Sequence, residues 1–525
     1  MRNGLKPELI ERVLGGKPKY TLDELEKKFP PRDLPEGAFV TRFAPSPTGF
    51  MHIGGLYQVL INSKLAQQTG GVFMLRIEDT DTKREVKDAV QIIIDSLDAF
   101  GLKYNNVPEY GPYYQSQRKD VYHSVAADLL AKGLAYPCFL TAVEMEEIRA
   151  RQNAAGFPTG IYSEFARDRD LTEEEIIAHL DKGEVPSIRL YSMGNPEQRI
   201  FCKDAVRGSI SFPENNEDLV LIKSNDGLPT YHFAHLCDDH FMRTTHVVRG
   251  AEWLSSLPLH YQLFRMMGWT PPLYIHTSTL DKLDAETGKQ RKLSKRHDPE
   301  SNVANLLADG WPTNAVLEYL FNIIASGYEE AKLKGAVKSI WDYEFRPKKI
   351  PMSGALFDMK KLEWWAKENI ATLPVPELVK SVIAWAQKYG DSMHAAQISD
   401  VEYLTSVLSI ERDNPKRIRK DFITWKQTLS EVAYFWDDLF VANTEFEFNK
   451  DALNEFLSTF DINDDKDTWW NKIVAIATKL GVKNGDVAMN LRVALTGRTN
   501  TPDLYSIMQV MGDKRVKQRV GSIIK

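Results

Sequence analysis

Cysteine is scarce in this sequence of 525 residues, which contains only 3. Cys138, Cys202 and Cys237 lie far apart along the chain, so they form neither a CxxC redox pair nor a zinc knuckle of closely spaced thiols. A disulfide framework is therefore excluded, and a reducing compartment is the default expectation for such a chain. We predict a cytoplasmic protein.

Long apolar runs and a large excess of one charge are also missing. No stretch approaches the roughly 18 apolar residues that cross a bilayer, so we expect no contact with a membrane. The 66 Lys and Arg residues against 72 Asp and Glu residues give a net charge of −6, which neither favours nor excludes a nucleic-acid partner. At roughly 100–200 residues per domain, the length predicts three or four domains.

The first part of the chain contains alternating strand and helix patterns. Residues 38–44 predict a strand, residues 53–70 an apolar-periodic helix, and residues 72–77 a second strand. A βαβ unit of this kind requires a parallel sheet. A second helix is predicted at 86–100. Strands that resume the sheet are predicted at 219–223, 245–249 and 273–280, and amphipathic helices dominate from about residue 302 onward.

Residues 41–55, TRFAPSPTGFMHIGG, span the junction of the first predicted strand and helix. Ligands bind at the carboxyl ends of parallel strands, where a helix N-terminus presents free N–H groups to a phosphate. His52 can donate a hydrogen bond to phosphoryl oxygens, and Gly54 and Gly55 leave space for a nucleotide. A bare HxGG is more often a tight turn with a surface histidine, but the whole segment favours a nucleotide site.

This segment resembles the HIGH-type motif of class I aminoacyl-tRNA synthetases, in the TRFAPSPTG form found in glutamyl-tRNA synthetases. Glutaminyl enzymes usually have Pro-Glu-Pro-Asn where residues 45–48 read PSPT, and this difference favours glutamate. The resemblance extends from about residue 38 to the end of the chain. It implies an α/β fold in which a Rossmann-like parallel-sheet catalytic domain carries an α+β insertion and is followed by an all-α anticodon-binding region.

The resemblance and the predicted elements together give a domain division. Thr21 is a plausible helix cap in the polar N-terminal part, which looks accessory. We expect an N-terminal extension at 1–37, the first half of the catalytic domain at 38–115, an inserted acceptor-stem-binding domain at 116–220, the second catalytic half at 221–301, a helical stem-contact region at 302–370, and the anticodon-binding domain at 371–525.

An acidic run, RIEDTD at residues 76–81, ends the second predicted strand. Such a run is often only a solvated turn, but a carboxylate at a strand end beside a nucleotide site can bind a substrate ammonium group. The run resembles a segment of the same family, and Glu78 is the candidate for the amino group of glutamate. The family match also implies that Arg42 and Ser46 contact glutamate.

Residues 231–253 form the third motif, which is rich in histidine. Its spacing contains no HExxH, no Cys/His quartet and no clear 2-His-1-carboxylate pattern, so we expect no transition-metal site. The block resembles the family's YHxANVVDDHxMxxTHVIRGEEW segment. This match implies that Tyr231 and Arg249 contact glutamate, and that Glu252 lies near ATP. Either Arg249 or Arg42 is expected to pair with a carboxylate through two parallel hydrogen bonds.

The chain departs from the family pattern at two positions of this block. His235 stands where the family commonly has Asn, and the match implies that it contacts glutamate. Ala251 stands where the family has an acidic residue.

Residues 291–298, RKLSKRHD, form the fourth motif. A basic cluster is most often a solvated loop or an electrostatic patch for RNA. Here it resembles the KLSKR form of the class I KMSKS loop, which implies that Lys292 and Lys295 are catalytic and neutralise the departing pyrophosphate. The same match places Arg296, like both lysines, in the ATP site.

The sequence bears on two metals, Mg²⁺ and zinc. Pyrophosphate chemistry normally needs Mg²⁺, which is held largely by phosphates and water, so no protein ligand is named. Many relatives carry a zinc knuckle in the insertion, whereas this chain has only Cys138, with Leu140 at the next ligand position. We therefore expect no zinc, and a buried Cys138 without a ligand role.

Near the C-terminus, residues 489–498, MNLRVALTGR, resemble a segment of the bacterial-type anticodon-binding domain. A basic cluster lies near Trp425. It is equally compatible with a solvent-exposed, charged helix face and with an RNA-binding surface that combines phosphate contacts with base stacking. Its members are Arg412, Lys416, Arg417, Arg419 and Lys420.

The four ordered motifs imply ATP-dependent ligation of L-glutamate to tRNA(Glu) through a glutamyl-adenylate, with release of AMP and pyrophosphate. Charging of tRNA(Gln) as well remains open, and a monomer is expected. A truncated paralogue that modifies a tRNA base would resemble only the catalytic half. A synthetase-like RNA-binding protein without activity predicts loss of His52 or Lys295, and both are present.

Overall fold

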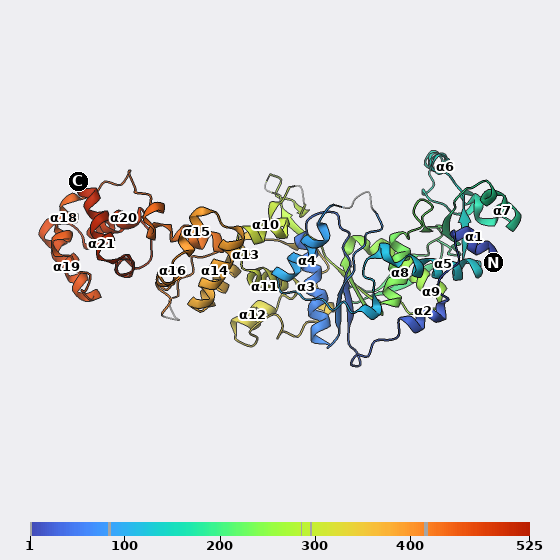
Figure 1. Ribbon diagram of the computed structural model, residues 1–525, viewed down its shortest axis with the longest axis horizontal. Helices are drawn as coiled ribbons and strands as arrows, with labels where there is room; N and C mark the ends of the chain where they lie inside the picture. Colours follow the sequence, from blue (N-terminus) through green and yellow to red (C-terminus); the bar gives the residue numbers. More distant parts are fainter. Residues whose placement is uncertain (1–2, 82–85, 285, 295–296, 414–417) are drawn as a thin grey trace. The chain divides into compact units, whose positions relative to one another are not determined.

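The computed structural model describes residues 3–81, 86–284, 286–294, 297–413 and 418–525. The chain forms two compact units (Figure 1). Unit 1 comprises Met1–Val303 and Leu320–Phe357, and unit 2 comprises Ala304–Tyr319 and Asp358–Lys525. The finer division into six parts stays a prediction. No helix in the described part of the chain is long and apolar enough to span a membrane.

The predicted βαβ unit is present. β1 (Val40–Phe43) pairs in parallel with β2 (Val72–Leu75), and α3 (Ile53–Gln68) connects them. All four residues of β1 are buried, as expected for strands that are covered on both faces. The helix predicted at 86–100 is α4 (Ala89–Ala99).

A four-stranded sheet lies beside this unit, in the order β6-β5-β9-β8. β8 (His246–Gly250) and β9 (Leu273–Thr277) are parallel. The backbone N–H of Thr245 donates to the carbonyl of Val40 over 2.9 Å, which brings the start of β8 beside β1. The carboxyl ends of these parallel strands therefore face a common edge, where ligands bind in open α/β sheets.

Strand pairing differs from the prediction in two places. The strand expected at 219–223 is β7 (Val220–Ile222), but it pairs antiparallel with β4 (Ser187–Leu190) instead of resuming the parallel sheet. The segment 273–280 forms not one strand but β9 and β10 (Leu280–Leu283), which lie in different sheets. The remaining strands are β3 (Ala135–Cys138), β5 (Arg199–Asp204), β6 (Gly208–Pro213), β11 (Gln290–Lys292) and β12 (Ala355–Leu356).

The N-terminal extension is part of the core of unit 1. Thr21 caps α2 (Leu22–Lys28), as predicted, and the structure adds a reciprocal capping box with Glu24. Leu9, Leu25 and Phe29 are buried in the cluster that also contains apolar residues of α5, α8 and α9. The helices of unit 1 not yet named are α1 (Pro7–Leu14), α5 (Lys119–Ala131), α6 (Ala142–Ala155), α7 (Glu173–Asp181), α8 (Tyr231–Phe241), α9 (Leu257–Met267) and α12 (Tyr328–Leu333).

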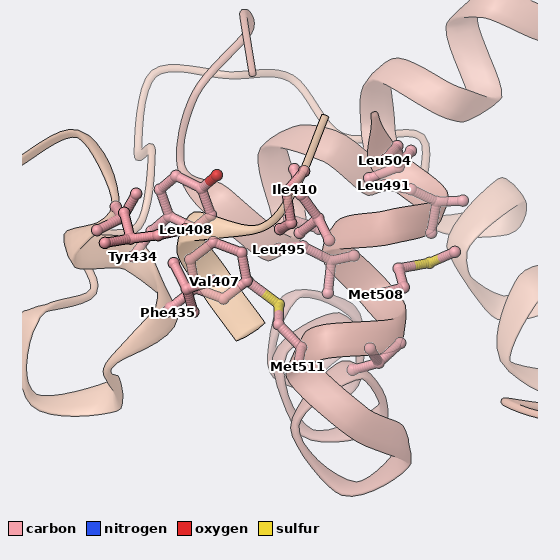
Figure 2. Packing of buried hydrophobic residues seen from close by; sticks show 14 of the residues in the cluster. Val407, Leu408, Ile410, Tyr434, Phe435, Leu491, Leu495, Leu504, Met508 and Met511 are labelled. Atoms are coloured by element: carbon pink, nitrogen blue, oxygen red, sulfur yellow. The ribbon is translucent and has the colours of Figure 1, made fainter. Parts of the chain in front are cut away.

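Unit 2 is helical, as predicted. Its central cluster packs residues of the loop after α16, such as Ile410, against residues of the two last helices, such as Leu491 and Met508 (Figure 2). Its helices are α13 (Met359–Thr372), α14 (Val375–Tyr389), α15 (Ser392–Ile398), α16 (Val401–Leu408), α17 (Trp425–Glu431), α18 (Lys450–Thr459), α19 (Lys466–Leu480), α20 (Asn484–Thr496) and α21 (Leu504–Ile524). α10 (Val303–Ala308) and α11 (Thr313–Ile324) lie where the chain passes between the units.

Candidate active site

A cavity of about 650 Å³ opens at the carboxyl edge of β1, β2 and β8. Five of the six residues predicted to bind glutamate line it. These are Arg42, Ser46, Glu78, Tyr231 and Arg249. Backbone hydrogen bonds join the first two motifs here, since the N–H of Glu78 donates to the carbonyl of Pro45 over 3.0 Å.

A buried charge network lies under the cavity and is centred on Asp239 of α8. Arg42 donates from Nε to Oδ1 of Asp239 over 3.1 Å, and Arg76 donates from Nη1 to the same oxygen over 2.6 Å. Burial alone would raise the pKa of Asp239, but Arg42 and Arg76 hold that pKa well below its usual range. Asp239 is therefore a carboxylate, and it fixes both guanidinium groups.

Glu78 places a carboxylate against the cavity. Nη2 of Arg76 lies 3.2 Å from its Oε1. Burial raises the pKa of Glu78, and the nearby guanidinium groups of Arg76 and Arg42 oppose that rise. The positive charge of a substrate ammonium group would favour the ionised form of Glu78 further. The position therefore fits the role predicted for Glu78.

Arg249, at the end of β8, faces the cavity with one nitrogen unsatisfied. Its Nε donates to Nε2 of His276 over 2.9 Å, and its Nη1 lies 3.4 Å from the hydroxyl of Tyr231. Its Nη2 is buried without a hydrogen-bond partner in the part of the chain that the structure describes. A buried donor without a partner is costly, and a ligand oxygen would satisfy it.

His235 does not line this cavity. It is fully buried below Tyr231, where its Nε2 lies 2.9 Å from the hydroxyl of Tyr274 and its Nδ1 lies 2.7 Å from Asp239. Burial lowers the pKa of His235 to about 3, so the ring is neutral near pH 7. Direct contact with glutamate stays a prediction, and the observed contacts favour a role in packing below Tyr231.

His52 caps the N-terminus of α3 with its own side chain. Its Nδ1 accepts a hydrogen bond from the N–H of Gly54 over 2.9 Å. A neutral imidazole that accepts at Nδ1 carries its proton at Nε2, so Nε2 is the donor that can serve a phosphate. A Cβ atom on Gly54 would lie only 3.0 Å from Nδ1, which explains the glycine at this position.

The motif 291–298 lies on and after β11. Lys292 approaches Glu252 to 3.5 Å, so two residues predicted for the ATP site form one exposed ion pair. Arg291 makes two parallel hydrogen bonds of 2.6 and 2.8 Å to Asp298, which closes the loop. Lys295 and Arg296 lie outside the described residues.

Comparison with known proteins decides the family. The family described as "tRNA synthetases class I (E and Q), catalytic domain" matches residues 38–364, and "Anticodon binding domain" matches residues 378–524. The chain is 44% identical to a glutamate–tRNA ligase of Clostridium perfringens, over 94% of this chain and 96% of that one. It belongs to the class I (E and Q) tRNA synthetases.

Two further relatives support the assignment. A glutamate–tRNA ligase of Acetivibrio thermocellus is 43% identical over 94% of this chain and 95% of its own length. The crystal structure of a glutamate tRNA ligase from Elizabethkingia meningosepticum in complex with its amino acid superposes with a TM-score of 0.77 at 28% identity. That superposition covers 93% of this chain and 99% of the other. The α/β catalytic region and the helical C-terminal region are therefore those of an ATP-using class I synthetase.

Sequence reasoning missed several residues of the synthetase's cavity. Lys223 donates to the carbonyl of Thr80 and to Asp226, both over 2.8 Å, and these residues form one wall. Trp253 covers another part, with its ring 4.4 Å from that of Tyr231. The polar turn directly before the third motif was the available signal for Lys223 and Asp226. His276 had no such signal, because its contact with Arg249 arises only from the pairing of β8 and β9.

No group of three or more His, Cys, Asp or Glu side chains that could hold a metal is found among the described residues of the synthetase. Cys138 is buried at the end of β3, and burial raises the pKa of its thiol. A thiol with a raised pKa is a poor metal ligand, because metals bind the thiolate.

Arg412, Arg419 and Lys420, the described members of the basic cluster near Trp425, lie between α16 and α17. Nη2 of Arg412 donates to the carbonyls of Ile370 and Leu373, each over 2.8 Å, at the end of α13. Arg419 pairs with Asp421, and Lys420 pairs with Glu368. Lys416 and Arg417 lie outside the described residues. The three described members therefore have structural partners, while Arg419 and Lys420 also border a second cavity of about 620 Å³ that Arg498 lines.

Proposed function

We propose that the synthetase ligates L-glutamate to tRNA(Glu) with ATP, through a glutamyl-adenylate, and releases AMP and pyrophosphate. One observation supports glutamate above all. Arg42, Arg249 and Glu78 line one cavity, and Nη2 of Arg249 is unsatisfied among the described residues. Two guanidinium groups and one carboxylate complement an amino acid with two carboxylates and one ammonium group.

The reaction needs no protein nucleophile. A carboxylate oxygen of glutamate forms a bond to the α-phosphorus of ATP while the bond to pyrophosphate breaks. A terminal ribose hydroxyl of the tRNA then attacks the acyl carbon, and AMP leaves. Catalysis on this scheme comes from positioning and from charge stabilisation of the transition state.

The residues of the synthetase have distinct roles in this scheme. His52 donates from Nε2 to phosphoryl oxygens of ATP, and Gly54 and Gly55 let the nucleotide approach the backbone. Lys292 and Lys295 neutralise the departing pyrophosphate, and Glu252 and Arg296 complete the ATP site. We infer that Mg²⁺ arrives with ATP and is held largely by phosphates and water.

The tRNA contacts extend the proposal to unit 2. The match to an anticodon-binding domain supports recognition of the anticodon arm there, with phosphate pairing and base stacking as the chemistry. Charging of tRNA(Gln) remains an alternative, because recognition of the anticodon rests on a few side chains. A monomer in the cytoplasm stays our prediction.

Purified synthetase should be tested with tRNA(Glu) and tRNA(Gln) transcripts, each with glutamate and with glutamine. We expect glutamate to be attached to tRNA(Glu). Attachment of glutamate to both transcripts would identify a non-discriminating enzyme. Binding of tRNA without any charging would instead support the non-catalytic RNA-binding alternative.

We also expect the dialysed protein to contain no stoichiometric zinc, because a four-coordinate site needs neighbouring thiols or imidazoles that Cys138 lacks in the sequence. Elemental analysis measures this directly. One zinc per chain after dialysis would contradict the prediction.

A further inference from the structure

Arg249 is held by uncharged acceptors, in contrast to the other two arginines of the site. Its Nε donates to Nε2 of His276 over 2.9 Å, and its Nη1 lies 3.2 Å from Nδ1 of His260. Arg42 and Arg76 instead donate to the carboxylate of Asp239. Among the described residues, no carboxylate accepts a hydrogen bond from Arg249.

The hydrogen bond on the other nitrogen of His276, Nδ1, explains why Nε2 can accept a hydrogen bond from Arg249. Its Nδ1 lies 2.7 Å from Oδ2 of Asp204, and the same oxygen accepts from the backbone N–H of His276 over 3.1 Å. The other oxygen, Oδ1, accepts from the N–H groups of Val206 and Arg207 over 2.9 and 2.8 Å. Asp204 is thus fixed and accepts a hydrogen bond from Nδ1–H of His276, which leaves the lone pair of Nε2 for Arg249.

His260 has the complementary arrangement. Its Nδ1 faces Arg249, so its Nε2 carries the proton and donates to Nδ1 of His232 over 3.0 Å. The pKa of His232 is lowered to about 4, mainly by burial and to a smaller extent by the positive charge of Arg249. Burial lowers the pKa values of His260 and His276 as well. All three rings are neutral near pH 7.

Neutral acceptors orient a guanidinium group without cancelling its charge. An Asp or Glu in the same place would also orient Arg249, but it would compete with a substrate carboxylate. The one nitrogen left over, Nη2, is buried without a partner among the described residues, and Arg249 itself lines the cavity. Arg249 is therefore prepared for an anionic oxygen.

We propose that His276, fixed by Asp204, is a positioning residue for Arg249. It orients Arg249 toward the side-chain carboxylate of the substrate without cancelling the charge of the guanidinium group. The site thereby selects a carboxylate over an amide. This inference rests on the proposed function. The α-carboxylate must be free to attack phosphorus, so a rigidly held guanidinium is suited to the other carboxylate. A neutral amide of the same shape gains hydrogen bonds from Arg249 but not the attraction between opposite charges.

Two substitutions of similar size separate the two sides of the imidazole. His276→Gln places its amide near the position of Nε2, where its oxygen can accept from Arg249. His276→Asn places its amide near Nδ1, where it can donate to Asp204 but cannot reach Arg249. Both variants keep a polar group in the same buried place, and they serve as each other's control.

The measurements are the KM for glutamate, the KM for ATP, the ratio of kcat/KM for glutamate over glutamine, and the melting temperature, all with full-length protein and tRNA. We expect His276→Asn to raise the KM for glutamate about tenfold, which corresponds to about 1.4 kcal/mol, and to lower the selectivity ratio. The KM for ATP should change less than about twofold. His276→Gln should stay within about threefold of the wild type in all of these values.

Equal effects of the two variants, or equal increases in the KM for glutamate and for ATP, would overturn the proposal and leave His276 a structural residue. If His276→Asn does not fold, His276→Met provides the variant without an acceptor. Failure of the wild-type protein to charge tRNA(Glu) would instead refute the proposed function. The two failures are therefore distinguishable.

Discussion

At the scale of single residues, the site uses its three arginines in two ways. Arg76 has no exposed surface and is surrounded by Asp238, Asp239 and Glu78, so its charge is compensated inside the protein. Arg42 shares Asp239 but lines the cavity. Because Asp239 accepts from Nε of Arg42, the terminal nitrogens of Arg42 remain available at the cavity wall for a ligand.

This geometry predicts the effect of Arg42→Lys. Lysine keeps the charge, but one ammonium group cannot pair with Asp239 and also offer a planar pair of donors to a substrate carboxylate. We expect the KM for glutamate to rise at least about tenfold, and much more than the KM for ATP. Steady-state charging assays that vary each substrate in turn measure both constants. Equal increases would argue against a glutamate-specific role.

Two partly buried histidines also predict how stability depends on pH. Burial lowers the pKa values of His232 and His246 to about 4, below the value of about 6.5 for an unfolded chain. Between these values the unfolded state binds more protons, so these groups stabilise the fold above pH 6.5, and this contribution is lost as the pH falls toward 4. Each such histidine contributes a slope of up to about 1.4 kcal/mol per pH unit within that window.

Urea unfolding at pH 7, 6 and 5 measures this slope. His246→Gln removes one of the titrating groups, so the free energy of unfolding of this variant should fall less steeply with acid than that of the wild type. Parallel curves for the two proteins would show that His246 titrates normally in the folded state.

At the scale of elements, α2 of the extension fixes the end of α8. Glu26 accepts from Nη2 of Arg243 over 2.5 Å and lies 2.6 Å from Nε2 of His240. Arg243 has a positive φ of 60°, which is unusual for a residue with a side chain. These contacts hold the C-terminal end of the helix that carries Asp239, so the extension supports the site although it supplies none of the residues that line the cavity.

Glu26→Ala should therefore destabilise the protein by about 1 kcal/mol, because it leaves a half-buried Arg243 and His240 without their anionic partner. Lys6→Ala is the matched control. Lys6 pairs with Glu173 of α7 over 2.8 Å, but its side chain is 72% exposed, so its removal should have almost no effect. Thermal unfolding of both variants tests this, and equal losses would contradict the proposed role of Glu26.

The helices and strands also show which parts of the fold can be predicted from the sequence. The βαβ unit and the helix cap at Thr21 depend on residues close in sequence, and both were predicted. The partner of β7 and the break between β9 and β10 depend on which distant strand supplies hydrogen bonds, and periodicity carries no information on that choice. His276 was missed for the same reason, because it meets Arg249 only across a strand pair.

At the scale of the whole molecule, the chain passes between the two units more than once. The segment 304–319 belongs to unit 2, where Nε1 of Trp385 donates to the carbonyl of Ala308 and the N–H of Trp425 donates to the carbonyl of Gly310. A Cβ atom on Gly310 would lie 2.9 Å from the backbone nitrogen of Lys426, and its φ is +81°. A cut after about residue 370 would remove these partners, so point substitutions test unit 2 more cleanly than truncation.

Arg498 is the residue of choice for such a test. It borders the second cavity, where its Nη2 donates to the carbonyl of Ser430 over 3.1 Å and its Nη1 pairs with Glu431. Its guanidinium carbon lies 5.7 Å from the ring centroid of Tyr434, which is itself buried. A guanidinium group at the border of this polar cavity is suited to pairing with an RNA phosphate.

We expect Arg498→Gln to raise the KM for tRNA(Glu) about fivefold and to reduce the slope of log affinity against log salt concentration by about 1, as the loss of one phosphate contact predicts. The KM values for ATP and glutamate at saturating tRNA should not change, because all residues that line the first cavity belong to unit 1.

Lys479→Gln is the control, since Lys479 pairs with Glu455 on α18 and does not line the second cavity. If Lys479→Gln weakens tRNA binding as much as Arg498→Gln does, unit 2 attracts tRNA only through its general charge. If neither variant changes the salt slope, Arg498 does not contact the RNA backbone.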